Sequence, residues 1–249
     1  MKFTPEEIKT LSEEFKSATP QEILQWALEN FCPNLAMSSS FQTQSVPLLH
    51  MVKEINPEMP VFFLDTGMHF WDTLFFREHI EQIWGLNIVD LRPDEKWRTV
   101  LRHFGSDLPE TDPNLCCYIR KVQPMQQTMN GLDVWITGIR RDQTGNRAHA
   151  KILEYKRDGL LRIAPLLNWT TEHIRDYIAE HDLPTHPLPR SQYPSVGCKP
   201  CTRAIQLGEK ERAGRWAGKG KTECGLHTEM FNKTKLTDDD FKLKLDINQ

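Results

Sequence analysis

The chain has 249 residues, a hydrophobic fraction of 39% and a formal net charge of −3 at pH 7, which together suit one domain with a packed core. The small net charge argues against a general nucleic-acid-binding protein. No apolar stretch is long enough to cross a membrane, and the acidic, amphipathic N-terminus lacks the apolar core of a signal peptide. We therefore expect a cytoplasmic protein with reduced thiols and with neither nucleic-acid nor membrane partners.

The chain opens with two predicted helices, because residues 4–7 and 19–22 both read Thr-Pro-x-Glu, which is typical of a capped helix start. Strands and helices then alternate. Predicted strands lie at 34–38, 59–67, 87–93 and 133–141, predicted helices at 44–55, 69–85, 117–129 and 168–182, and a predicted hairpin at 151–165 turns at Asp158-Gly159. This order indicates an α/β fold with a mostly parallel sheet flanked by helices. Such sheets bind ligands beyond the carboxyl ends of their strands.

The composition changes after about residue 183, where a Pro-rich segment begins. Residues 199–221 contain seven Lys or Arg and two Glu, with little periodicity. We therefore predict two parts. Residues 1–202 form the α/β domain with its N-terminal helices and a metal site, and residues 203–249 form a flexible, locally basic tail.

Six cysteines are present. Cys116 and Cys117 are adjacent, and Cys198 and Cys201 are separated by two residues. In a reducing compartment, these spacings indicate metal binding, catalysis or packing. The two pairs supply four thiolates, which zinc or an iron–sulfur cluster can accept. Adjacent cysteines fit poorly around one tetrahedral ion, whereas a cubane offers each its own iron, so the pattern favours a cluster. Cys32 follows an apolar run and is expected to pack in the core.

The remaining cysteine, Cys224, lies in the polar segment KTECGLH. A thiol is a nucleophile only as a thiolate, and nearby cations lower its ordinary pKa of about 8.5. The candidate cations are Arg212, Arg215, Lys219, Lys221 and His227. An unreactive exposed thiol is the alternative.

Two polar segments follow predicted strands. Residues 38–45 read SSSFQTQS, and hydroxyls before a helix N-terminus can hold phosphate. Arg140, Arg141 and Arg147 follow the strand at 133–141, and three arginines suit an anionic ligand. Without other features, a capped turn and a solvated loop would explain the two segments equally well.

Taken in order, these motifs resemble the assimilatory adenylyl-sulfate reductases, the iron–sulfur branch of the phosphoadenylyl-sulfate reductase family. They are SSSF at 38–41, LDTG at 64–67, CCYIRK at 116–121, TGIRRDQ at 137–143, CKPC at 198–201, ERAGRW at 211–216 and ECGLH at 223–227. The resemblance implies an adenine-nucleotide α-hydrolase-like fold. The related ATP pyrophosphatases carry an S-G-G-x-D-S loop, and its absence from residues 38–45 counts against ATP cleavage.

The resemblance also implies a reaction, in which adenosine 5′-phosphosulfate (APS) is reduced to sulfite and AMP. The adenosine and phosphate end would bind Ser38, Ser40, Leu64, Gly138, Arg140 and Arg147. The catalytic set would be Cys224 as nucleophile, with Lys121, Arg212, Arg215 and His227 around the phosphosulfate. Attack on sulfur would give an S-sulfo-cysteine, and thioredoxin or glutaredoxin would release sulfite.

One [4Fe-4S] cluster would be held by Cys116, Cys117, Cys198 and Cys201. Lys121 lies four residues beyond Cys117, one turn away on a helix, so one segment would anchor the cluster and direct a cation at the substrate. The sequence leaves the oligomeric state open, a homo-oligomer included.

Three other functions stay open. The first is the same reaction on the 3′-phosphorylated nucleotide, PAPS, or on both substrates, although family members lacking the cluster cysteines are those that use PAPS. The second is a zinc-containing nucleotide-binding or regulatory protein without catalysis. The third is an ATP pyrophosphatase acting on tRNA or sulfate.

Overall fold

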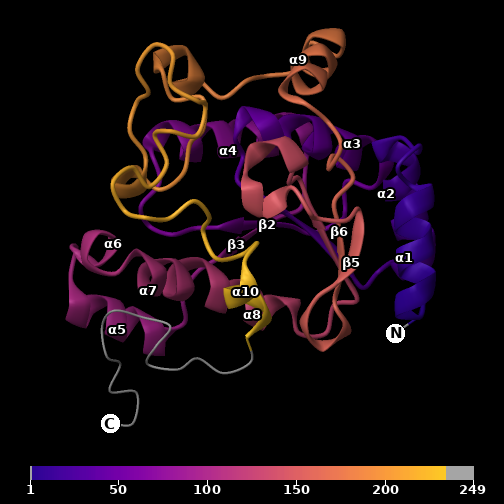
Figure 1. The fold of residues 1–249 in the computed structure, drawn as a ribbon, viewed down its shortest axis with the longest axis horizontal. Coiled ribbons are helices and arrows are strands. Elements are labelled where there is room, and N and C mark those ends of the chain that lie inside the picture. The colour runs from indigo at the N-terminus through magenta and orange to yellow at the C-terminus, as the bar shows by residue number, and fades with distance from the viewer. Residues whose placement is uncertain (1, 234–249) are drawn as a thin grey trace.

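A computed structural model describes residues 2–233, which contain a six-stranded sheet in the order β3-β2-β1-β4-β6-β5 (Figure 1). The strands are β1 Leu35–Ser39, β2 Val61–Leu64, β3 Ile88–Leu91, β4 Val134–Thr137, β5 Leu153–Tyr155 and β6 Leu161–Ile163. Every strand pair is parallel except β5 with β6, which form the predicted hairpin. The predicted α/β fold with a mostly parallel sheet is therefore confirmed.

The central strands are buried on both faces because their alternating side chains enter two separate cores. Met37 of β1 and Ile136 of β4 pack into one core, and their neighbours Ala36 and Trp135 pack into the other. Helices cover both faces of the sheet (Figure 1).

Helices on the first face match the predictions. They are α1 Pro5–Glu14, α2 Pro20–Phe31, α3 Val46–Ile55, α4 Trp71–Trp84 and α9 Thr171–Glu180. The two N-terminal capping boxes form as expected, because Thr4 and Thr19 each accept a backbone hydrogen bond from the glutamate three residues later. Among the described residues, no helix is both long enough and apolar enough for a membrane crossing.

The second face carries several helices that the sequence analysis left out. They are α5 Glu95–Phe104, α6 Leu108–Thr111, α7 Pro113–Cys117 and α10 Glu229–Asn232, in addition to the predicted α8 Gln123–Met129. Between α7 and α8, residues Tyr118–Val122 form a π-helical turn. Short 3₁₀ turns lie at Thr43–Ser45, Arg141–Gln143, Gly145–Arg147, Arg157–Gly159, Leu188–Ser191 and Lys199–Cys201.

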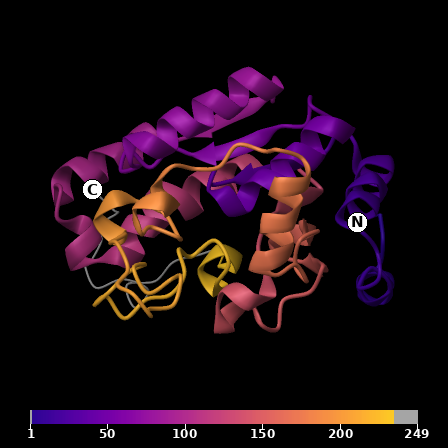
Figure 2. The same ribbon diagram turned by 90° about the horizontal axis from the view of Figure 1, so that it is seen from above.

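Residues 203–233 fold back onto the domain, mostly as irregular coil. Trp216 donates a backbone hydrogen bond to the Cys201 carbonyl at 3.0 Å, and the side chains of Trp216, Leu226 and Phe231 are buried. In Figure 2 the orange and yellow segments gather on one side of the molecule. The division after residue 202 and the mobility of this segment stay predictions, and residues 234–249 of the predicted tail lie outside the described residues.

The predicted packing of Cys32 is wrong. Cys32 is exposed because α2 ends at Phe31 and Cys32 is the C-cap residue, with an extended backbone.

Candidate active site

A pocket of about 540 Å³ lies beyond the carboxyl ends of β1, β2 and β4, where the sheet topology predicts a ligand. Its walls include every residue that the sequence analysis assigned to catalysis or substrate binding. These are Ser38, Ser40, Leu64, Lys121, Gly138, Arg140, Arg147, Arg212, Arg215, Cys224 and His227. Residues separated by almost 190 positions in the chain thus share one cavity.

Trp135 supports the base of the pocket and was missed by the sequence analysis. Its indole Nε1–H donates to Ser38 Oγ at 2.8 Å, and its ring stacks on His227 with centroids 5.4 Å apart at 10°. Trp135 lies in β4, and its side chain is completely buried. Trp135 therefore links the serine at the end of β1 to the histidine of the ECGLH motif.

His227 differs from the expected cation. Burial, followed by the charge of Arg147, holds the pKa of its imidazole well below the ordinary value. Its Nδ1 atom has no hydrogen-bond partner within residues 2–233. In the ligand-free protein His227 is therefore a neutral ring with one unused nitrogen, which suits a hydrogen bond to a ligand rather than a charge–charge contact.

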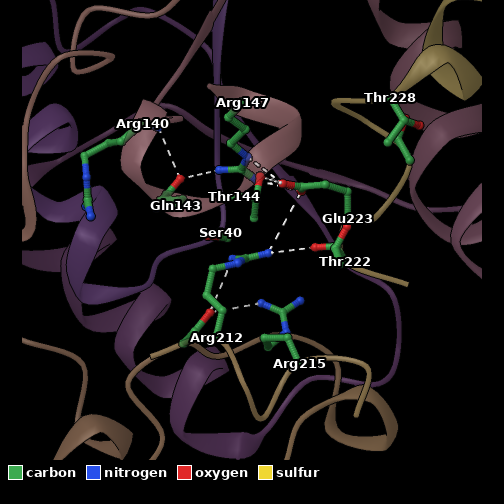
Figure 3. A network of polar contacts seen from close by, with 12 residues as sticks. Ser40, Arg140, Gln143, Thr144, Arg147, Arg212, Arg215, Thr222, Glu223 and Thr228 are labelled. Carbon is green, nitrogen blue, oxygen red and sulfur yellow. Dashed lines mark hydrogen bonds and ion pairs between the residues drawn. The ribbon is translucent and has the colours of Figure 1, made fainter. Parts of the chain in front are cut away.

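Arg140 and Arg147 both have protein partners in the ligand-free pocket (Figure 3). Arg140 is 1% exposed, and its guanidinium donates to Asp142 at 3.1 Å and to Thr171 at 3.0 Å. Arg147 is paired with Glu223, a residue that the sequence analysis did not assign. No local pattern could have found this pair, because the two residues are 76 positions apart.

Arg212 and Arg215 supply positive charge on the opposite wall. Burial and the neighbouring Arg215 lower the pKa of Arg212 to about 10. Burial likewise lowers the pKa of Arg215, although Cys198 and Cys224 oppose that shift. Crowded, partly buried cations gain free energy from an anionic ligand. The pocket is therefore suited to a negatively charged substrate.

Lys121 is a third cation in the pocket lining, beside Arg212 and Arg215. Burial disfavours its charge, but the thiols of Cys198, Cys224 and Cys117 outweigh burial and raise the pKa of Lys121 above its ordinary value. The lysine lies in the π-helical turn, so its side chain reaches the pocket from a wider turn than the expected α-helix.

The four predicted metal-binding cysteines are each buried and line a second, much smaller cavity. Lys121, Arg215 and Trp216 line both cavities, so these side chains form the wall between them. Thr66 Oγ1 lies 3.4 Å from Cys198 Sγ, and Lys219 Nζ lies 4.0 Å from Cys201 Sγ. The thiol donors and the neighbouring cations fit a group that carries net negative charge.

The donor arrangement also bears on the choice between zinc and a cluster. Within the described chain, no three His, Cys, Asp or Glu side chains converge as a single metal ion requires. Four thiols around one cavity are a donor set that either zinc or an iron–sulfur cluster accepts.

The fold and the pocket define an α/β protein whose arginines and lysine at the ends of its parallel strands suit an anionic ligand. The chain belongs to the phosphoadenosine phosphosulfate reductase family, because the model of that domain matches residues 34–204. This confirms the family resemblance drawn from the motifs.

Named relatives extend over nearly the whole chain. The chain is 40% identical over 229 residues to an adenosine 5′-phosphosulfate reductase of Streptomyces coelicolor, covering 90% of this chain and 96% of the relative. It is 37% identical over 224 residues to the protein of the same name from Bacillus cereus strain ATCC 14579, covering 89% and 96%.

Solved structures share the fold. A phosphoadenylyl-sulfate reductase from Candida auris, solved as a phosphate complex, matches with a TM-score of 0.70 and 26% identity, covering 80% of this chain and 97% of that one. An FMN adenylyltransferase from Candida glabrata matches with a TM-score of 0.53 and 17% identity, covering 77% and 62%. The second likeness concerns the fold alone.

Proposed function

We propose that this chain reduces adenosine 5′-phosphosulfate to sulfite and AMP in sulfate assimilation. The observation that carries the proposal is that Cys224, Lys121, Arg212 and Arg215 line one pocket at the strand ends. The relatives named as adenosine 5′-phosphosulfate reductases support the choice of substrate.

The proposed first step is attack of the Cys224 thiolate on the sulfur of APS. The S–O bond to the nucleotide breaks, AMP leaves with the electron pair, and the sulfo group stays on Cys224. Lys121, Arg212 and Arg215 offset the charge of the phosphosulfate and of the departing phosphate. His227 lines the pocket and donates or accepts a hydrogen bond through its neutral ring.

The second step needs two electrons from a dithiol protein, for which we propose thioredoxin or glutaredoxin. A donor thiolate attacks the sulfur of Cys224, sulfite leaves, and the second donor thiol releases Cys224 as a thiol while the donor becomes a disulfide. Cys32 is exposed, but it does not line the pocket, so an external dithiol is the better reductant. We also propose a cytoplasmic location, where such donors are reduced.

We propose that Cys116, Cys117, Cys198 and Cys201 hold one [4Fe-4S] cluster. When bound, the cluster supplies fixed negative charge beside Lys121 and Arg215 and ties α7 to the 198–201 turn. The sulfo-transfer step needs no electron from it, because the thiol chemistry is balanced without one. An anaerobic preparation should be brown and contain iron, whereas a colourless preparation that contains zinc would overturn this assignment.

The test of the nucleophile is mass spectrometry of the enzyme mixed with APS in the absence of a thiol donor. A sulfo group is expected on the peptide that contains Cys224. Cys224→Ser should lose sulfite formation and keep its iron, and Cys32→Ser is the matched control that should retain both. Normal turnover by Cys224→Ser would refute the assignment.

PAPS is the second candidate substrate, favoured by the likeness to the C. auris enzyme. Competition between APS and PAPS for limiting enzyme measures the preference directly. A parallel assay for ATP consumption tests the remaining alternative of an ATP pyrophosphatase, for which no hydrolysis is expected.

A further inference from the structure

Glu223 is a buried carboxylate in the lining of the pocket, to which Asp142 and Glu211 also contribute. It directly precedes Cys224, and its residue is 3% exposed. Arg147 binds it through two parallel hydrogen bonds, from Nε to Oε1 at 2.8 Å and from Nη2 to Oε2 at 2.7 Å. Thr144 Oγ1 donates a third at 2.6 Å. Such a bidentate buried pair fixes both partners in orientation, and removal of one partner leaves an uncompensated charge.

Each of the three nitrogen atoms of the Arg147 guanidinium donates a hydrogen bond to a protein side chain. Besides the two bonds to Glu223, its Nη1 donates to Gln143 Oε1. Figure 3 shows Arg147 and Arg212 approaching Glu223 from different directions, and Arg212 Nη2 lies 4.0 Å from the carboxylate. Arg147 therefore holds the chain segment that carries Cys224.

The residues just before Glu223 are attached to helices outside the pocket lining. Lys219 donates to Glu110 at 2.6 Å and to the Pro109 carbonyl at 3.1 Å. Lys221 donates to Asn114 Oδ1 at 2.7 Å. These partners lie in α6 and α7, the helices beside the four-cysteine cavity.

Together the two attachments tie the segment to two separate parts of the domain. The lysines bind the segment to the helical side, and Glu223 binds it to the 141–147 loop beyond β4. Cys224 follows immediately, and its side chain packs both against the core on the second face of the sheet and against the group of Cys198, Cys201 and Trp216. The ion pair of Glu223 therefore acts on the backbone directly beside the thiol.

We propose that Glu223 is a positioning residue, whose pair with Arg147 holds the Cys224 segment across the pocket and keeps the thiol at the substrate. Its effect on sulfo transfer rests on the proposed function, whereas its effect on the location of Cys224 does not. The proposal also gives Arg147 a role beside its predicted contact with the nucleotide. Through its bonds to Glu223, Arg147 holds the segment that carries Cys224.

The test is the rate at which iodoacetamide alkylates Cys224 in the ligand-free holoenzyme, followed by mass spectrometry of its peptide. Glu223→Gln removes the charge but keeps the shape, so the segment should open more often and alkylation should accelerate by roughly tenfold or more. Glu209→Gln is the matched control. It breaks another bidentate Arg–Glu pair in the same segment, Arg203–Glu209, outside the pocket lining, and should leave the rate unchanged.

A double-mutant cycle makes the test specific to the pair. Because Arg147→Gln breaks the same contact, the double variant should react no faster than either single variant. An increase below threefold for Glu223→Gln, or a double variant equal to the product of the two single effects, overturns the proposal. Should Glu223→Gln fail to fold, Thr144→Ala removes one of the three hydrogen bonds, and it should accelerate alkylation by at least twofold.

A second measurement separates this proposal from the proposed function. Single-turnover sulfo transfer to Cys224 from saturating APS should slow in Glu223→Gln by a factor similar to the rise in alkylation. If wild-type Cys224 accepts no sulfo group while Glu223→Gln still accelerates alkylation, the proposed function fails and the positioning role of Glu223 stands.

Discussion

Replacing Gly225 with alanine should displace Cys224, because this glycine has a backbone conformation and a close approach that a side chain cannot share. Its φ is +94°, a region that L-residues rarely adopt. An added Cβ would lie 3.0 Å from Val122 Cγ2 and 2.9 Å from Met230 Sδ. Met230 can move, but Val122 is fully buried in the π-helical turn and has a stiff, branched side chain.

The expected loss of activity follows from two free-energy costs, the backbone conformation and the crowding at Val122. The backbone conformation costs about 1–2 kcal/mol for alanine, and the crowding at Val122 adds about 1 kcal/mol. A loss of about 2–3 kcal/mol from the closed segment corresponds to a roughly 30- to 150-fold fall in the rate of sulfo transfer. Sulfite production from APS with excess thioredoxin measures this rate.

Gly220→Ala is the control, in the same segment. Its φ is +61° and an added Cβ would meet no atom within 4 Å, so it carries the backbone term alone, about 1 kcal/mol or roughly fivefold. Equal activities of the two variants would refute the argument that packing behind Gly225 fixes the nucleophile.

Three further predictions concern the cysteine site, the base of the pocket and pH. Cys117→Ser should give a colourless protein whose iron content per chain is near zero, and retention of full iron would remove Cys117 from the ligand set. Trp135→Phe keeps the stack on His227 but loses the bond to Ser38, so KM for APS should rise by roughly fivefold, about 1 kcal/mol; an unchanged KM would place Ser38 outside the substrate contacts. His186 donates to Thr73 and accepts from the Leu188 backbone N–H, and burial lowers its pKa to about 4. Because the unfolded chain binds this proton near pH 6.5 and the folded chain does not, stability falls as pH drops from 6.5 toward 4, by about 2 kcal/mol at pH 5. Urea unfolding at pH 7 and pH 5 should show a correspondingly smaller difference for His186→Gln, and an equal difference would exclude His186 as the source.

The fold was largely predictable because its signals are local. The capping boxes before α1 and α2, the buried run of β2 and the alternation of strands and helices each occupy a short stretch. Helix α5 was missed although its apolar residues Trp97, Leu101 and Phe104 recur at helical spacing. That signal was present in the sequence, and the many charges of the segment obscured it.

The residues of the site were recognisable, but the state of several was not. The motifs identify His227 as a functional residue, yet only burial and the nearby charge of Arg147 lower the pKa of its ring. Cys32 follows an apolar run and still lies exposed, because the helix ends one residue before it.

The sequence by itself determined the α/β alternation and the four-cysteine pattern, because each depends on residue type and short spacing, and the family resemblance of its motifs indicated part of the pocket lining. Only the tertiary structure decided which charges pair. The bond between Arg147 and Glu223 joins residues 76 positions apart, and that between Trp135 and Ser38 joins residues 97 apart. Parallel β-strands bring such residues to one edge of the sheet, and burial there makes each unpaired charge costly. The ion pair that holds the segment before Cys224 is therefore fixed by tertiary packing, which no local sequence pattern encodes.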